Sequence, residues 1–584
     1  MRDQKNYNEK VINMNEENSK LKQKLDLAFS CIQNNNYTEA VTIYEEILLE
    51  NKNNFDANSN LGMLYAQQND FEEAEKYLNK AITINPNNPY AHNNLASVLI
   101  RLGRNEESIN YSQKAVKINN NFSLAYNNLG LAQKNIKKNE DSKISFLKAI
   151  EKEKANVLPY YNLANLYEEL NDIKNSEIYY LKAIEINAKF INSYNNLMNL
   201  YERTNNDSKL KLIIEKGEKE FPDQLFIKLF KGKLQFKSGL YNEAINNLES
   251  FKFGKNEYSK EISRCNTLAN SYDEIKKFDE AFEYFELANQ INFEINRHRV
   301  NKEKAIELVE NRINYFNEKN IKDWNSIDIE NGEKNPIFII GFPRSGTTLL
   351  DTILRSHPKI EVIEEKPIIN NFIKTLDKKI NSNFFNLKNL DKKSLEEMRI
   401  SYFDILNNYT KQEKQKIIID KMPLNIIYVG EIVRIFPDAK FILAIRHPCD
   451  CILSCFMQSF YLNDTMANFI DLESTSKFYN QVMILWKKYL NIFKVNYHLI
   501  RYEDLVNNFD INVKNLLNFL DLEWSDSVEK FYETAKERGK ISTPSYNQVN
   551  KPIYIKSVGR WKNYEKKFKE IYPNIEFWIK NFKY

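Results

Sequence analysis

Residues 337–350 have the types and spacing of a loop that binds an anionic group. An apolar run at 337–340 predicts a strand, residues 341–346 hold two glycines and a proline, and apolar residues at helical spacing follow from Thr347. The N–H groups of such a turn and the positive end of the helix dipole point to one place, so we expect the loop to hold a phosphate. Gly341 and Gly346 let the backbone turn and approach a ligand closely.

The nearest general pattern is the Walker loop, G-x-x-x-x-G-K-[ST]. Gly341 and Gly346 have its spacing, but Thr347 stands in place of the lysine, and the positive charge lies within the loop as Arg344. A nucleotide triphosphatase needs that lysine on the transferring phosphates. The loop is therefore expected to bind phosphate without ordinary ATP chemistry; the alternative is a strand, turn and helix without a ligand.

The sequence GFPRSGTTLL from Gly341, followed by Ser356-His357-Pro358, resembles the 5′-phosphosulfate loop of sulfotransferases. It is most similar to the tyrosylprotein sulfotransferase branch and its bacterial relatives. That family transfers a sulfonate from 3′-phosphoadenosine 5′-phosphosulfate (PAPS) to a hydroxyl. The resemblance covers residues 334–565 and implies that PAPS is bound by Arg344, Ser345, Gly346, Thr347 and Thr348.

A second group of residues suggests where the other end of such a cofactor binds. Arg446 ends an apolar strand predicted at 439–446, and Ser454 follows on the next predicted helix. Arginine offers a planar fork for a phosphate and serine a short donor, and the pair resembles the family's 3′-phosphate site. A surface ion pair is the alternative for Arg446. Tyr502, Ser545 and Arg560 resemble further cofactor contacts, and Arg560 stands where the family has a lysine.

The resemblance also implies a general base. Glu364-Glu365 stands where tyrosylprotein sulfotransferases have a Glu-Glu pair, whose second member takes the acceptor's proton. A carboxylate within hydrogen-bond range can do this, so Glu365 is the expected base. A solvated acidic pair is the alternative. Other sulfotransferases use a histidine, and His357 is the candidate of that kind.

Lys421, in Asp420-Lys421-Met422-Pro423, is similar to the family's Lys-x-Pro. Lys421 and Arg344 would bridge the sulfonate and the leaving phosphate, where fixed cations lower the barrier as charge develops. No metal is expected. The reading is a PAPS-dependent sulfotransferase, and two alternatives from other classes are a P-loop kinase that uses Mg²⁺ and ATP and a non-catalytic scaffold.

The first half of the chain is a repeat array. Leucines recur every 34 residues, and small residues follow them at fixed offsets, which is typical of tetratricopeptide repeats (TPR). Two helices pack closely where one presents a small residue to a bulky one. About eight repeats are expected, for docking of a peptide or protein, for self-association, or as scaffold alone. The leucines are Leu27, Leu61, Leu95, Leu129, Leu163 and Leu197.

The second half alternates predicted strands with helices, which indicates an α/β sheet. The fold class is thus a TPR α-solenoid followed by a P-loop-like α/β sulfotransferase domain with a mostly parallel sheet. The strands are predicted at 337–340, 361–365, 416–420, 439–446 and 498–502. The expected domains are a polar extension (1–23), the repeats (24–295), a helical linker (296–333) and the sulfotransferase domain (334–584).

Composition limits the class of protein. The 584 residues are 42% hydrophobic and 28% charged, as in soluble globular proteins. Residues 334–584 hold 38 Lys+Arg and 29 Asp+Glu, whereas the rest hold 45 and 50, so the excess of cations lies with the phosphate loop. Cys449, Cys451 and Cys455 lack metal-site spacing and are expected to be buried on a helix.

These patterns also predict location and partners. The N-terminus has no apolar core and no long apolar run follows, so we expect a cytoplasmic protein without a signal peptide or membrane anchor. The expected partners are PAPS, a hydroxyl-bearing acceptor such as protein tyrosine, and a protein in the TPR groove. No nucleic acid is expected.

Overall fold

The computed structural model describes residues 19–322, 324, 335–410, 416–537 and 557–584. The chain forms two compact units, Met1–Leu234 and Gln235–Tyr584, and their boundary falls within α13 (Leu225–Lys237). No helix in the described ranges is both long and apolar enough to cross a membrane. The predicted fold class, helical repeats followed by a domain built on a parallel sheet, is confirmed.

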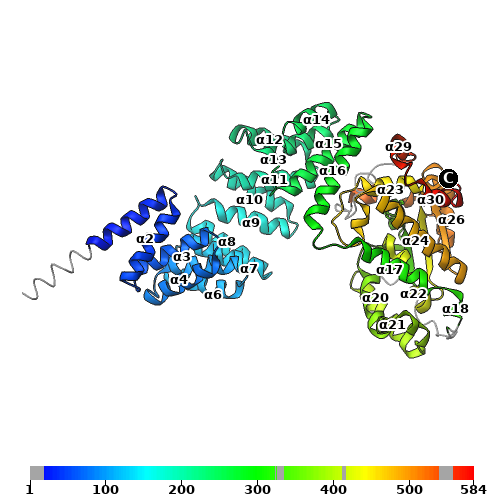
Figure 1. Ribbon diagram of the computed structural model, residues 1–584, viewed down its shortest axis with the longest axis horizontal. Coiled ribbons are helices and arrows are strands. Elements are labelled where there is room, and N and C mark those ends of the chain that lie inside the picture. The colour runs from blue at the N-terminus through cyan, green and yellow to red at the C-terminus, as the bar shows by residue number, and fades with distance from the viewer. Residues whose placement is uncertain (1–18, 323, 325–334, 411–415, 538–556) are drawn as a thin grey trace, which may run out of the picture. The chain divides into compact units, whose positions relative to one another are not determined.

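All regular secondary structure in the described chain from residue 19 to Asn296 is helical. Figure 1 shows the helices of the first unit stacked in blue to cyan. The first spans 19–33. The others are α2 (Tyr37–Glu50), α3 (Phe55–Gln67), α4 (Phe71–Ile84), α5 (Pro89–Arg101), α6 (Asn105–Ile118), α7 (Ser123–Asn135), α8 (Asn139–Lys152), α9 (Val157–Glu169), α10 (Ile173–Ile186), α11 (Ile191–Arg203), α12 (Asp207–Glu220), α13, α14 (Tyr241–Glu249), α15 (Tyr258–Glu274) and α16 (Phe278–Asn296).

The small residues of the repeat are required by close helix contacts. A Cβ atom on Gly130 would lie 2.7 Å from the ring of Phe146, so a side chain there would force this ring to move. The serine thirteen positions after the repeat leucine also forms a hydrogen bond to the other helix of the repeat. Ser142 Oγ donates to the Gly130 carbonyl at 2.7 Å, and Ser108 Oγ donates to the Ala96 carbonyl at 2.8 Å. The 34-residue pattern therefore specifies the contact between the two helices of a repeat.

The sheet has five strands in the order β2-β3-β1-β4-β5, and every neighbouring pair is parallel. All five predicted strands are present, with bounds shifted by one or two residues. Because the strands are parallel, their carboxyl ends lie along one edge, where ligands bind in sheets of this kind. The strands are β1 (Ile337–Gly341), β2 (Ile360–Glu364), β3 (Ile417–Lys421), β4 (Lys440–Ile445) and β5 (Asn496–Arg501).

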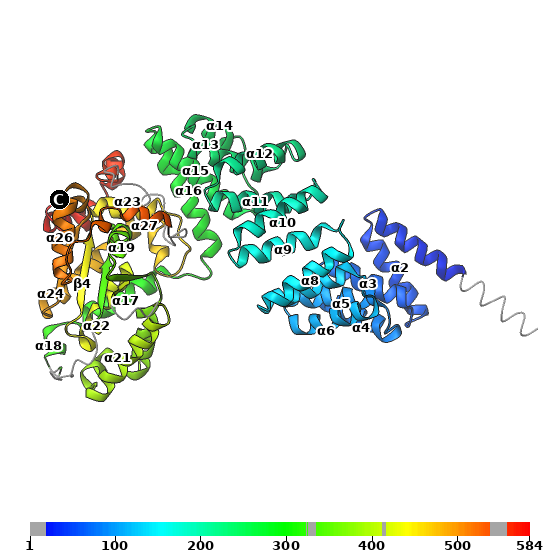
Figure 2. The ribbon, with the colours of Figure 1, turned by 180° about the vertical axis from the view of Figure 1, so that it is seen from behind.

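Helices surround this sheet, and Figure 2 shows β4 among them with α19 nearby. They are α17 (Lys302–Tyr315), α18 (Glu318–Ile321), α19 (Thr347–Ser356), α20 (Ile368–Lys379), α21 (Lys392–Asn407), α22 (Val429–Ile435), α23 (Pro448–Phe456), α24 (Leu472–Ile492), α25 (Tyr502–Asn507), α26 (Phe509–Phe519), α27 (Phe531–Glu537), α29 (Glu565–Phe568) and α30 (Tyr572–Asn581). The 3₁₀ turns are Phe384–Asn389, Pro423–Tyr428, Met466–Phe469, Asp526–Val528 and Arg560–Tyr564.

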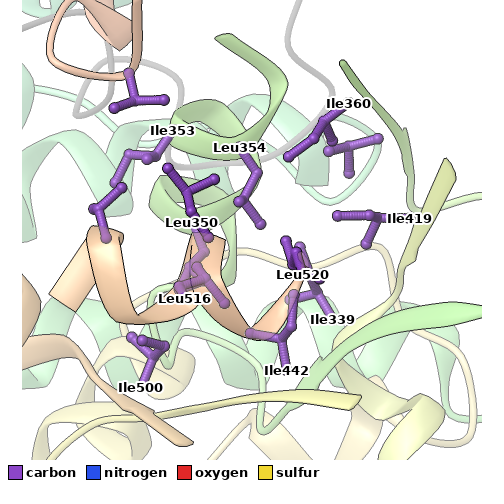
Figure 3. Packing of buried hydrophobic residues seen from close by; sticks show 14 of the residues in the cluster. Ile339, Leu350, Ile353, Leu354, Ile360, Ile419, Ile442, Ile500, Leu516 and Leu520 are labelled. Carbon is purple, nitrogen blue, oxygen red and sulfur yellow. The ribbon is translucent and has the colours of Figure 1, made fainter. Parts of the chain in front are cut away.

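The core on one face of the sheet fixes α19, the helix after the phosphate loop. Each strand contributes a buried aliphatic side chain to this face, and α19 and α26 cover it (Figure 3). Leu350 and Leu354 of α19 are fully buried against Ile339 of β1. The start of α19 is therefore held at the end of β1. The labelled side chains are Ile339, Leu350, Ile353, Leu354, Ile360, Ile419, Ile442, Ile500, Leu516 and Leu520.

The linker predicted at 296–333 contains a helix that packs against the unit with the sheet. Its helix α17 packs on α24, and Arg312 Nη2 lies 2.7 Å from Glu431 Oε1 of α22. Both side chains are buried. Removing one member would leave the other charge buried without its partner, which typically costs several kcal/mol. The ion pair thus makes α17 a structural part of the unit that contains the sheet.

Candidate active site

The loop between β1 and α19 has the expected tight geometry. Gly341 lies against β4, where a Cβ atom would meet the Ala444 carbonyl oxygen at 2.4 Å. Gly346, with φ +98°, is the N-cap of α19. Ser345 is buried, and its Oγ has no hydrogen-bond partner in the described part of the chain. The first N–H groups of α19 have no acceptor within the helix, so the loop directs backbone donors to the carboxyl edge of the sheet.

Tyr502, the first residue of α25, lies against the end of this loop. Gly346→Ala would place a Cβ atom 2.7 Å from Tyr502 Cδ2 in a conformation that side chains rarely adopt. We expect this variant to lose about 1–3 kcal/mol of unfolding free energy, measured by urea denaturation. Gly239→Ala is the control, because Gly239 has φ +77° with no atom near its Cβ position. Equal losses in the two variants would contradict the close contact with Tyr502.

Arg446 and Ser454 lie beside the loop. Arg344 Nε donates to Ser454 Oγ at 3.0 Å, and Arg446 Nη1 approaches the Arg344 carbonyl oxygen at 3.4 Å. The Arg446 guanidinium also lies 5.3 Å from the centre of the Tyr502 ring. From β1 the chain continues to β2 and β3 on one side, while β4 and β5 lie on the other. The loop and Arg446 thus flank the point where the strand order reverses, the usual ligand position.

One nitrogen of the Arg446 guanidinium has protein partners, whereas another has none in the described part of the chain. Its Nη2 donates to the carbonyl of Ser557 and lies 3.9 Å from Asp450 Oδ1. Its Nε is buried and has no hydrogen-bond partner among the residues that the structure describes. A buried donor without a partner costs free energy. Among the described residues, Arg446 Nε and Ser345 Oγ are therefore two buried polar groups that could each bind an oxygen of an anionic ligand.

Lys421 ends β3 and lies among three carboxylates. Its Nζ is 2.8 Å from Glu365 Oε1, 3.4 Å from Glu364 Oε1 and 3.8 Å from Asp351 Oδ2. Lys421 is fully buried, whereas one third of the Glu365 side chain is exposed. The ammonium group thus fixes one oxygen of a carboxylate that solvent, and hence an acceptor, can reach.

The backbone of Glu365 is strained. Its φ is +48°, uncommon for a residue with a side chain, and its N–H donates to the Lys421 carbonyl at 2.8 Å. Such conformations cost about 1–3 kcal/mol and concentrate at functional sites. The turn after β2 therefore holds Glu365 against Lys421 at some cost in stability.

His357, the other candidate for the base, does not lie at the carboxyl edge of the sheet. It follows the last turn of α19, near the start of β2 and therefore at the amino edge of the sheet. Its Nδ1 accepts from the Lys359 N–H at 3.2 Å, so its Nε2 carries the proton and donates to the Glu523 carbonyl at 3.1 Å. Burial lowers the pKa of His357. With both ring nitrogens engaged, His357 is poorly placed to act as the base.

His447 shapes the turn before α23, as its position beside Pro448 suggests. Its Nδ1 accepts from the Cys449 N–H at 3.3 Å, and burial lowers its pKa to about 4. The three clustered cysteines are buried on α23, as expected from their spacing.

Arg560 and Ser545 are two further residues that were predicted to contact the cofactor. Arg560 forms an ion pair with Asp273 of α15, at 2.7 Å between Nη2 and Oδ2, so in this structure a repeat helix holds its charge. Ser545 lies outside the described residues. Thr347 and Thr348 are buried in the first turn of α19, where the sequence placed them.

Comparison with known proteins identifies the two parts of the chain. Residues 336–526 match the model of the sulfotransferase family, and tetratricopeptide repeat models match 55–88, 77–110, 124–155, 159–190 and 262–294. Residues 336–526 form a sulfotransferase-family domain. The repeats and this domain occur together in one chain, as the sequence predicted.

Two relatives and one solved structure illustrate the similarity. An uncharacterized protein from Aquifex aeolicus (strain VF5) is 29% identical over 53% of this chain and 40% of its own length. Protein-tyrosine sulfotransferase 2 from Gallus gallus is 25% identical over 45% of this chain and 70% of its own length. The crystal structure of MamA matches 28% of this chain and 95% of its own at 20% identity, with a TM-score of 0.26 that supports no argument. The chain thus spans less than half of the Aquifex relative.

In the sulfotransferase-family domain, two buried aspartates that the sequence reading did not single out contact the site. Asp351 of α19 lies near Lys421 and accepts from Arg355 Nε at 2.9 Å. Asp450 of α23 accepts from the N–H groups of Gly559 and Trp561 at 2.7 and 2.9 Å. The i, i+4 spacing of Asp351 to Arg355 and of Arg446 to Asp450 was a local signal, but their contacts with β3 and the C-terminal segment depend on the fold.

Proposed function

We propose that this protein is a PAPS-dependent sulfotransferase that moves a sulfonate group to an acceptor hydroxyl. The observation that carries the proposal is the placement of the β1 loop and Arg446 on either side of the strand-order reversal in a sulfotransferase-family domain. Relatives named protein-tyrosine sulfotransferase make protein tyrosine the first acceptor to test. The repeats would dock a protein substrate or partner.

The residues at the carboxyl edge fit a nucleotide with two separate phosphate groups. One phosphate would take the N–H groups of the α19 terminus, Ser345 and Arg344. The other would bind Arg446, whose Nε has no hydrogen-bond partner within the described ranges. Bound PAPS would supply the sulfonate and leave as adenosine 3′,5′-bisphosphate. The described residues already provide cations and amide donors for these anionic groups.

The chain's own groups then have distinct tasks. Glu365, exposed enough to reach an acceptor, would take the proton of the acceptor hydroxyl and so make its oxygen nucleophilic. Lys421 orients Glu365 through their ion pair. Lys421 and Arg344 would stabilise the charge that develops on the leaving oxygen.

Binding of the bisphosphate product tests the donor site directly. We expect calorimetry to show that the full-length protein binds adenosine 3′,5′-bisphosphate, and that Arg446→Ala raises the Kd by about 10- to 150-fold, because a hydrogen bond to a charged group contributes about 1.5–3 kcal/mol. Arg297→Ala is the control, since Arg297 is exposed and pairs with Glu294. Loss of affinity in the control, or none in Arg446→Ala, would contradict the assignment.

Thermal shifts separate this proposal from the alternatives. A ligand that binds the folded state raises its stability, by about 2.7 kcal/mol at one hundred times the Kd. The bisphosphate should stabilise the protein more than Mg²⁺ with ATP. A preference for Mg²⁺ and ATP would favour a kinase, and no response to either would favour a scaffold. Labelled PAPS with a tyrosine-containing peptide then tests the transfer and its acceptor.

A further inference from the structure

The last pair of repeat helices, α15 and α16, contacts the helix that follows Arg446. The Phe282 ring stacks on Phe456 with centroids 4.7 Å apart, and Asn289 Nδ2 donates to the Phe456 carbonyl at 2.8 Å. Phe456 is the last residue of α23, the helix that carries Asp450 and Ser454. Both repeat helices belong to the same compact unit as the sheet. These contacts join the repeat structure to the Arg446 side of the candidate site.

The segment 557–561 lies against Arg446 and is tied there by Asp450. The buried Asp450 carboxylate accepts from the N–H groups of Gly559 and Trp561. The Ser557 carbonyl, at the start of the same segment, accepts from Arg446 Nη2. This segment therefore holds one end of the guanidinium, while the Nε edge stays unpaired within the described chain. The orientation of Arg446 depends on where the segment lies.

The repeat helix α15 holds the other side of that segment. Asp273, in the last turn of α15, accepts from Arg560 Nη2 at 2.7 Å through one oxygen and from the Tyr564 hydroxyl through the other. Tyr564 is buried, and its ring contacts Phe278 and Phe282 of α16. Arg560 directly follows Gly559, which Asp450 binds. One carboxylate of the repeat array thus fixes two side chains next to the segment that orients Arg446.

We infer that Asp273 is a positioning residue for the donor site, acting through residues 557–564 on the guanidinium of Arg446. The inference rests on the proposed function, in which Arg446 binds a phosphate of the donor. It goes beyond that function because it makes the last repeat part of the donor site, in addition to any docking surface. Without Asp273 the segment loses its anchor on α15, Arg446 loses its fixed orientation, and the phosphate that Arg446 binds is held less tightly.

The test compares two nucleotides on the full-length protein. Adenosine 3′,5′-bisphosphate carries the phosphate expected at Arg446, whereas adenosine 5′-monophosphate lacks it. We expect Asp273→Ala to raise the Kd of the bisphosphate by about five- to tenfold, with the Kd of the monophosphate unchanged. Tyr564→Phe, which keeps the buried ring and removes only the hydroxyl, should give a smaller loss of the same kind. Calorimetry measures both ligands.

The control is Asp279→Ala, which removes a carboxylate in the first turn of α16, where the side chain is mostly exposed and 3.7 Å from Lys567. It should leave both affinities unchanged. Unchanged bisphosphate affinity in Asp273→Ala would overturn the inference, even if the melting temperature fell. Equal losses for both nucleotides would also overturn it, because they indicate general destabilisation. If the unaltered protein binds neither nucleotide, the proposed function fails as well.

Discussion

Replacing Glu365 by glutamine is expected to lower kcat for sulfonate transfer by about 10²–10⁴-fold, the usual contribution of a general base. Glutamine keeps the shape of the side chain and an oxygen that can accept from Lys421, so the ion pair at 2.8 Å becomes a hydrogen bond from the ammonium group to an uncharged acceptor. It cannot take a proton from the acceptor. Because Glu365 is not placed to hold the nucleotide, the Kd of adenosine 3′,5′-bisphosphate should stay within about twofold. Initial rates with labelled PAPS, together with calorimetry, measure the two effects separately.

Glu364 is the matched control for this variant. It precedes Glu365 in the chain and also lies near Lys421, at 3.4 Å, but it is buried at the end of β2 where an acceptor cannot reach it. Glu364→Gln should therefore lower kcat by less than about tenfold. Retained activity in Glu365→Gln, with loss of activity in His357→Asn, would reverse the assignment of the base.

Asp420→Asn is expected to change how stability depends on pH. Asp420 of β3 is buried on the face opposite to Lys421, and neither of its oxygens has a hydrogen-bond partner among the residues described. Burial raises its pKa to about 8. In the unfolded chain this pKa is about 4, so between these values the folded state binds more protons. The stability of the unaltered protein therefore falls as the pH rises from about 4 to about 8.

Asparagine cannot ionise, so Asp420→Asn should lack this decline. The two proteins should be similar near about pH 4, and the variant should be more stable at about pH 8 by up to roughly 5 kcal/mol, from about 1.4 kcal/mol per pKa unit. Urea unfolding from about pH 4 to about pH 8.5 measures the difference. Asp438→Asn, on an exposed residue before β4, should follow the unaltered protein. Parallel curves for Asp420→Asn and the unaltered protein would show that Asp420 is charged in the fold.

Much of the fold could be predicted because its signals are local. The 34-residue leucine period, the small residue after each leucine and the apolar runs of the five strands depend on neighbours in the sequence. The phosphate loop is local too, since Gly341, Arg344 and Gly346 lie within six residues. Contacts between distant residues were not visible in this way. Residues 302–315 were predicted as part of a helical linker, and in the structure Arg312 of this segment pairs with Glu431, more than one hundred residues away.

For the candidate site, the residues were visible in the sequence but most of their partners were not. Arg560 was assigned to the nucleotide because it stands where the resembling family has a lysine, whereas the structure pairs it with Asp273, 287 residues earlier. His357 and Glu365 are eight residues apart, yet β2 carries the chain between them from one edge of the sheet to the other.

The sequence by itself determined which elements form and which residue types end each strand. Hydrophobic period, glycine spacing and strand length act over a few residues, so they can be read without the fold. Only the tertiary structure decided that Lys421 lies among three carboxylates, that Arg446 is oriented by Ser557, and that a repeat helix reaches the same segment. Those contacts join residues about 50 to almost 300 positions apart, and burial of the core, not any local pattern, brings them together.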